Sequence, residues 1–218
     1  MRHLGLLLLS ASLPSAAFAQ PDFRTHNFTA SFGAGQPRAD LRNLYSDSFL
    51  FGFNYGYRFH PLFQLDAGLD TVFGAAGVRD FLPTVFGDLR IRDHQFLAPF
   101  GGRAIIPIAS DRIQIFGGGG GTYFRYSERI RQPSDFYRID CSVCASRDGF
   151  GYYALAGANF ALDHYRHFRL GASARVYRGH TSGDPLGAVA GIRTRDHWVN
   201  LLGEFTFSFG GRPYWQMR

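Results

Sequence analysis

Residues 49–73 read FLFGFNYGYRFHPLFQLDAGLDTVF, two short segments that alternate in polarity on either side of His60-Pro61. Phe and Tyr occupy every odd position from 49 to 59, whereas Gly, Asn and Arg fill the even positions from 52 to 58. The second segment places Phe63 and Leu65 against Gln64 and Asp66 in the same way. A period of two is typical of a β-strand with one apolar face and one polar face, and the short link predicts a tight hairpin.

Similar segments recur to the end of the chain, and we expect eight strands in all. Their predicted spans are 26–33, 48–59, 62–73, 95–108, 112–126, 149–162, 168–177 and 197–209. The connections are alternately long and short, and the short ones, at 60–61, 109–111 and 163–167, are turn-like. This asymmetry predicts an all-β fold, an eight-stranded antiparallel up-and-down transmembrane β-barrel with tight turns at one end and long loops at the other.

The first nineteen residues have the features of an export signal. Arg2 supplies a positive start, the apolar run 4–13 is too short to span a membrane as a helix, and Ala17-Phe18-Ala19 resembles a cleavage site. We therefore expect a cleaved signal peptide at 1–19 and a single barrel domain at 20–218. No later apolar stretch is long enough for a membrane-spanning helix, so membrane insertion would require a closed barrel. Together these features predict the outer membrane of a Gram-negative bacterium.

The polar faces of the strands carry charges of both signs. If the aromatic faces point outward, one lumen receives the charged side chains Arg58, Asp66, Asp70, Arg103, Arg169, Arg175 and Glu204. A soluble barrel that binds an apolar ligand would need the opposite arrangement. Because eight strands enclose a lumen that side chains just fill, we expect these groups to form a salt-bridged plug. A narrow channel is the alternative.

Over nearly its whole length the chain resembles the small outer-membrane barrels of the OmpA and OmpX type. The resemblance rests on the strand pattern and on Phe205-x-Phe207-x-Phe209 in the last strand, which looks like that family's terminal signal. It implies assembly by the barrel assembly machinery and contact with outer-membrane lipid and lipopolysaccharide. It also implies a role in envelope structure or in surface interaction through the external loops, for which the sequence names no partner.

One group of residues suggests an enzyme. His180-Thr181-Ser182 resembles the late His-x-Ser pair of the outer-membrane lipid A deacylases, which would make His180 the base and Ser182 the nucleophile. A carboxylate must orient the base, and only Asp184 and Asp196 are available nearby. An outer-membrane lipid hydrolase is therefore an alternative to the non-enzymatic interpretation.

The remaining motifs predict no cofactor. Cys141 and Cys144 are the two cysteines, and in an exported protein they predict a disulfide within a long external loop. A zinc site would need about four ligands, which this loop does not offer, so we expect no metal. The 23 basic residues are scattered and form no stripe that would predict nucleic-acid binding.

Overall fold

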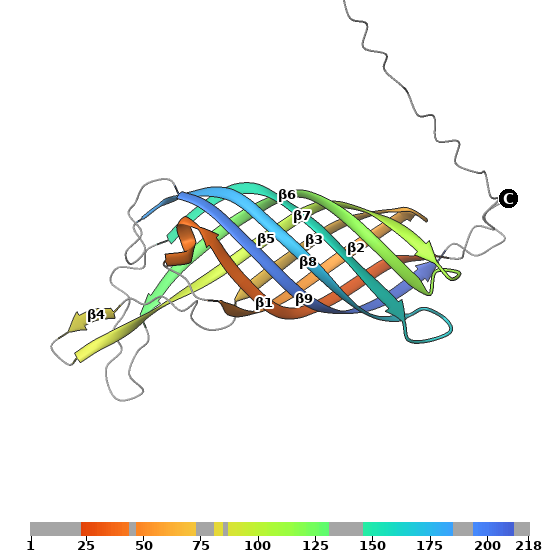
Figure 1. The fold of residues 1–218 in the computed structure, drawn as a ribbon, viewed down its shortest axis with the longest axis horizontal. Helices are drawn as coiled ribbons and strands as arrows, with labels where there is room; N and C mark the ends of the chain where they lie inside the picture. The colour runs from red at the N-terminus through yellow and green to blue at the C-terminus, as the bar shows by residue number, and fades with distance from the viewer. Residues whose placement is uncertain are drawn as a thin grey trace, which may run out of the picture.

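The computed structural model describes residues 23–43, 47–72, 81–84, 87–130, 146–184 and 194–211. Within these ranges it contains nine strands and one short 3-10 helix, coloured in chain order in Figure 1. The elements are β1 (Arg24–Ala39), η1 (Asp40–Asn43), β2 (Ser48–His60), β3 (Phe63–Val72), β4 (Phe81–Thr84), β5 (Gly87–Ile108), β6 (Ile113–Ile130), β7 (Ser146–Ala161), β8 (Phe168–Gly183) and β9 (Thr194–Gly211).

Eight of these strands form a closed antiparallel barrel. Neighbours in the sheet are neighbours in the chain, β9 pairs with β1, and β3 pairs with β5 to complete the circle. Closure leaves no long free edge, which removes the main hazard of an open sheet. The predicted fold, an eight-stranded up-and-down barrel, is confirmed.

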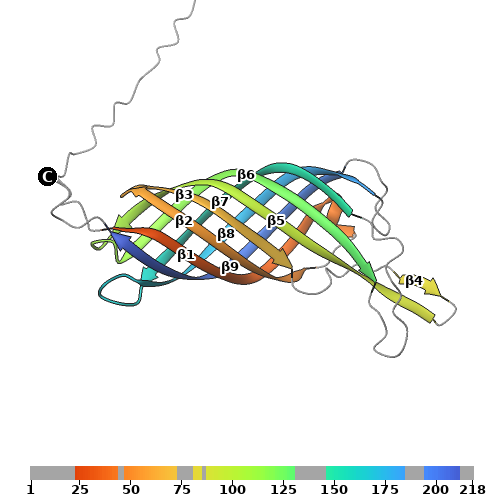
Figure 2. The ribbon, with the colours of Figure 1, turned by 180° about the vertical axis from the view of Figure 1, so that it is seen from behind.

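The two ends of the barrel differ. The short connections, residues 61–62, 109–112 and 162–167, lie at one end, which we call the turn end. The first and last described strands also meet there, since Arg24 pairs with Gly211. The longer connections leave the opposite end, which we call the loop end. β4 lies beyond the barrel at the loop end, where it pairs only with β5 (Figures 1 and 2).

Several strands run further toward the loop end than the sequence predicted, and β4 was not predicted at all. β1 continues past residue 33 to Ala39 through Pro37. Its pairing with β2 ends at Gly35, so Pro37 lies where β1 has a neighbour on one side only and a missing N–H costs little. β8 continues past residue 177 to Gly183, so His180 and Ser182 lie within a strand and not in a loop.

Polarity is reversed relative to a water-soluble barrel. The outward side chains are apolar and exposed, for example Phe53 at 58% and Ile106 at 61%. The inward side chains are largely polar and buried, and Asp70 is 0% exposed. Among the described residues, no helix has the length and apolar character needed to cross a membrane.

Candidate functional site: the lumen

A single carboxylate organises the lumen at the turn end. Asp111 accepts hydrogen bonds from Arg58 Nη1 at 3.1 Å, from Arg169 Nη2 at 3.0 Å and from Gln114 Nε2 at 2.9 Å. Arg58 also donates to the carbonyl of Pro61, which ties the β2–β3 turn to the same group. Because all three charged groups are buried, each is stabilised chiefly by the others.

The backbone of the β5–β6 turn presents this carboxylate in an unusual way. Ala109, Ser110 and Asp111 all have positive φ, at 51°, 55° and 67°. A left-handed conformation costs about 1–2 kcal/mol for each residue with a Cβ. The buried ion pairs of Asp111 hold the last of these residues inside the lumen and so offset part of that cost.

A second network lies near the middle of the lumen. Asp66 accepts from Arg103 Nε at 2.6 Å, from Gln64 Nε2 at 2.7 Å and from Asn54 Nδ2 at 3.0 Å. The guanidinium of Arg103 also lies over the ring of Phe116, 4.7 Å from its centroid, in a cation–π contact.

A third network joins opposite walls of the barrel. Arg175 on β8 donates to Asp70 on β3 at 2.8 Å and to Glu204 on β9 at 2.9 Å. Tyr177 donates its hydroxyl to the other oxygen of Asp70, and Ser173 donates to Glu204 at 2.6 Å. Arg175 thus serves two acids, and the two hydroxyl groups supply each acid with a further hydrogen bond.

Small residues make room for these groups. Gly52 on β2 faces the lumen beside Asp70, and a Cβ on Gly52 would lie 2.4 Å from both Asp70 Oδ1 and Ser31 Oγ. The backbone of β2 therefore approaches the carboxylate as closely as only a glycine permits.

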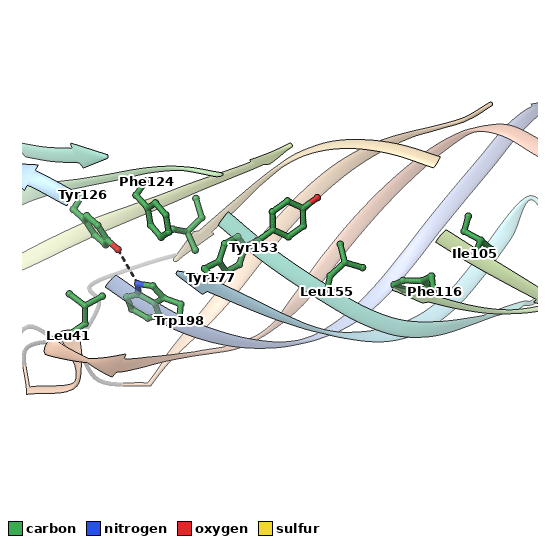
Figure 3. Close-up of a cluster of buried hydrophobic side chains, with 10 residues drawn as sticks. Leu41, Ile105, Phe116, Phe124, Tyr126, Tyr153, Leu155, Tyr177 and Trp198 are labelled. Atoms are coloured by element: carbon green, nitrogen blue, oxygen red, sulfur yellow. Dashed lines mark hydrogen bonds between the residues drawn. The ribbon is translucent and has the colours of Figure 1, made fainter. Parts of the chain in front are cut away.

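Aromatic side chains close the lumen toward the loop end. Leu41, Phe124, Tyr126, Tyr177 and Trp198 belong to one buried cluster (Figure 3). Trp198 donates its indole N–H to the hydroxyl of Tyr126 at 3.1 Å, so both polar groups have a hydrogen-bond partner within this apolar layer. These five side chains lie toward the loop end, whereas other members of the cluster, among them Phe116 and Ile105, lie beside the ionic networks nearer the turn end (Figure 3).

The free space between the turn-end and middle networks is small. A polar cavity between the turn-end and middle networks, lined by Gln64, Arg103, Gln114, Asn159 and Arg169, has a volume of about 10 Å³. That is room for about one water molecule.

The structure brings the predicted lumen residues together in part. Arg103 meets Asp66, and Arg175 meets both Asp70 and Glu204. Arg58 and Arg169 instead meet Asp111. Asp111 was predicted as a turn residue and not as a lumen residue, because Asp is common in turns for local reasons. Tyr177 was also missed, although it shares the inward alternation of Arg175.

The residues considered for hydrolysis do not form a catalytic group. His180 and Ser182 lie on the outer face of β8 and are exposed, whereas Asp196 is buried on the inner face of β9. Asp196 accepts a hydrogen bond from Thr194 Oγ1 at 2.8 Å inside the barrel. Its carboxylate is thus separated from His180 by the barrel wall and does not orient that ring. The lipid hydrolase alternative is not supported.

Other predicted features cannot be placed. Cys141, Cys144 and the segment 1–19 lie outside the described residues. Within the described ranges, no three or more His, Cys, Asp or Glu side chains gather as metal ligands would.

Comparison with known proteins identifies the fold and no sequence family. No family model matches the chain, and no curated protein matches it. Among solved structures it is similar to Neisserial surface protein A, with a TM-score of 0.53 and 11% identity over 84% of this chain and 97% of that one. It is also similar to the outer membrane protein OprG from Pseudomonas aeruginosa, with a TM-score of 0.50 and 13% identity over 86% and 99%. The resemblance to small eight-stranded outer-membrane barrels is confirmed at the level of the fold.

Proposed function

We propose that the chain is an integral outer-membrane protein with a filled lumen, which acts in envelope structure or in surface interaction through the connections at its loop end. The observation that carries the proposal is the reversed polarity of the wall. Large apolar side chains cover the outside, while the ion pairs are inside. In water such a surface would drive aggregation, whereas hydrocarbon solvates it without cost.

The height of the apolar wall supports this environment. On β9 the outward side chains from Phe207 to Val199 are apolar, and His197 is the first that is not. The nine residues from 199 to 207, in a strand tilted by about 40°, rise about 20 Å along the barrel axis, and the outward Phe209 extends the apolar face to about 25 Å. This rise matches the apolar band of about 25 Å that outer-membrane barrels present to lipid.

The packing of the lumen argues against a channel. Ionic networks near the turn end and in the middle are followed near the loop end by the aromatic side chains of Phe124, Tyr126 and Trp198. A steady ion current would have to pass both kinds of layer. We therefore place the function of the protein on its outside surfaces.

Export by a cleaved segment at 1–19 and insertion by the barrel assembly machinery belong to the same proposal. The motif Phe205-x-Phe207-x-Phe209 lies in β9, with all three rings on its outer face. The assembly machinery could therefore bind this motif on the strand that pairs with β1 to close the barrel.

The experiment combines location, orientation and conductance. In a Cys141→Ser, Cys144→Ser background, single cysteines at Asp47 and Ser110 lie at the loop end and the turn end. A membrane-impermeant maleimide added to intact cells should label Asp47→Cys and leave Ser110→Cys unlabelled until the envelope is broken.

The same protein should fractionate with outer membranes and migrate faster on gels before heating than after. Purified protein in planar bilayers should give no steady conductance. Recovery from the soluble periplasmic fraction would refute membrane insertion, and ohmic currents that persist at high salt would refute the filled lumen.

A further inference from the structure

Basic side chains form a patch on the outer wall near the loop end. Its residues are Arg38 on β1, Arg195 and His197 on β9, and Arg178 and His180 on β8, and we call them the basic patch. All five point outward, on the opposite side of the wall from the lumen networks.

The strand registers arrange the basic patch in two rows. In the first, His197 pairs with Arg178 on one side and with Arg38 on the other. In the second, His180 pairs with Arg195. Each of these pairs sets an arginine opposite a histidine, so two like charges face each other whenever the histidine is protonated. That arrangement is unfavourable unless an anion lies among them.

The described part of the chain supplies little negative charge to the basic patch. Asp40 lies 3.6 Å from Arg195, and both side chains are well exposed. Asp148, the nearest acid on the outer face of β7, lies one row further out opposite Ser182 and accepts a hydrogen bond from Tyr123. Within the described residues, neither Arg38 nor Arg178 forms an ion pair.

The basic patch lines a hollow in the wall and not a flat surface. A pocket of about 440 Å³ is bordered by Arg178, His180, Arg195 and His197, with Phe150 and Tyr152 of β7 at one side. Asp196 also belongs to its lining, but the carboxylate of Asp196 is buried inside the barrel, where it bonds to Thr194. Tyr152 pairs with Arg178 and Phe150 with His180, so the aromatic rings extend both rows. Aromatic rings beside cationic groups are typical of a membrane interface.

Below the basic patch the same strands form a shallow apolar depression of about 490 Å³. It is lined by Ala156 of β7, Ala172 and Ala174 of β8, and Leu201 and Gly203 of β9. Val176 and Val199 lie between the depression and the basic patch. A molecule with an anionic head and acyl chains would thus find charge above and a smooth apolar surface directly beneath.

We propose that the basic patch binds the phosphate groups of a phosphorylated glycolipid of the outer leaflet, whose acyl chains lie along the depression below. The proposal rests on the membrane orientation proposed above. Guanidinium groups match phosphate oxygens in charge and geometry. Two of them, Arg178 and Arg195, border one concave site, and Arg38 lies beside it, opposite His197. The patch begins where the apolar wall ends, which is the level of lipid phosphates.

The test uses purified protein in detergent and native mass spectrometry. The probes are diphosphorylated lipid A, the same lipid treated with phosphatase, and inorganic phosphate. We expect the wild type to retain the diphosphorylated lipid at least about tenfold more tightly than the dephosphorylated one. The double variant Arg178→Gln, Arg195→Gln should lose that preference.

Two further variants make the test specific. Arg125→Gln is the matched control, because Arg125 is exposed on β6, opposite Asp148 and outside the pocket. It should bind as the wild type does. Ala174→Phe fills the depression and should weaken retention of the acylated lipid severalfold while leaving retention of the deacylated phosphorylated headgroup unchanged.

Three results would overturn the site. They are equal retention of the two lipids, wild-type retention by the arginine double variant, and binding of inorganic phosphate as tight as that of the lipid. Heat-modifiable migration of each variant is recorded in parallel. A folded barrel in the outer-membrane fraction without lipid preference refutes the basic patch alone, whereas a soluble protein refutes the membrane proposal itself.

Discussion

The carboxylate of Asp111 provides the sharpest test of the lumen interpretation. Asp111→Asn changes the volume of the side chain very little but removes the negative charge between Arg58 and Arg169. Breaking a buried ion pair typically costs about 3–5 kcal/mol, because the remaining charge is left without compensation. Here two arginines lose one shared partner.

Other acceptors reduce that cost. Arg58 keeps the carbonyl of Pro61, and Arg169 keeps the Asn159 side chain and the backbone carbonyl of residue 111. We therefore expect a loss near the lower limit, about 3 kcal/mol, which is more than a hundredfold in the unfolding equilibrium. Asp111→Ala should cost more, since it also removes the acceptor for Gln114.

The assay is urea unfolding of the barrel in lipid vesicles, followed by the fluorescence of the tryptophans, one of which, Trp198, is buried in the barrel. Asp47→Asn is the matched control, because Asp47 is exposed at the loop end. A double-mutant cycle with Arg58→Gln isolates the coupling between the two charges. If Asp111→Asn unfolds within about 0.5 kcal/mol of the control, the turn-end network does not hold the barrel together.

Three other predictions, two from the structure and one from the sequence, can be tested separately. Glu204→Gln should cost less than Asp111→Asn, about 1–3 kcal/mol in the same unfolding assay, because Arg175 keeps its second acid; an unchanged midpoint would count against the third network. Burial opposes ionisation of Asp163 in the β7–β8 turn, but the backbone N–H groups of residues 168 and 167 donate to its carboxylate and lower its pKa. A lowered pKa stabilises the fold above the unfolded value of about 4 and loses that effect as the pH falls through the native value. The stability difference between wild type and Asp163→Asn should therefore shrink in acid, and a constant difference from pH 6 to pH 2 would contradict this. Finally, mass spectrometry after thiol blocking of envelope-derived protein should find Cys141 joined to Cys144, and two alkylated thiols would disprove the bridge.

The fold could be predicted from the sequence because two independent signals agree. Alternation in segments such as 49–59 defines which face of a strand is apolar, and the alternation of short and long connections defines the topology. The strand ends near the loop end were wrong for a physical reason. There both faces are polar, as at Arg178 and Thr181 of β8, so the alternation that identifies a strand disappears although the pairing continues.

For the lumen, the sequence predicts which side chains point inward but not which of them pair with one another. Alternation shows that Arg175 points inward, but its partner Asp70 is 105 residues away on the opposite wall. Which acid meets which base depends on the tilt and stagger of the strands, which set the height of each side chain along the barrel axis. The pairing of Arg58 with Asp111 adds a second difficulty, because it depends on the backbone conformation of one turn.

The layered lumen also explains why a single charge substitution should not turn this barrel into a channel. Removing Asp111 or Glu204 weakens one ionic network, yet the aromatic cluster around Trp198 still closes the lumen toward the loop end. Removing aromatic rings leaves the ionic networks in place below. There the backbone of β2 still lies close to Asp70, because Gly52 has no side chain. A continuous water path would require both kinds of layer to be disrupted together, and the resulting loss of buried contacts would be a large part of the stability of a small domain. On the proposed function, the interior of the barrel therefore serves stability, and binding falls to the outer wall and the loop end.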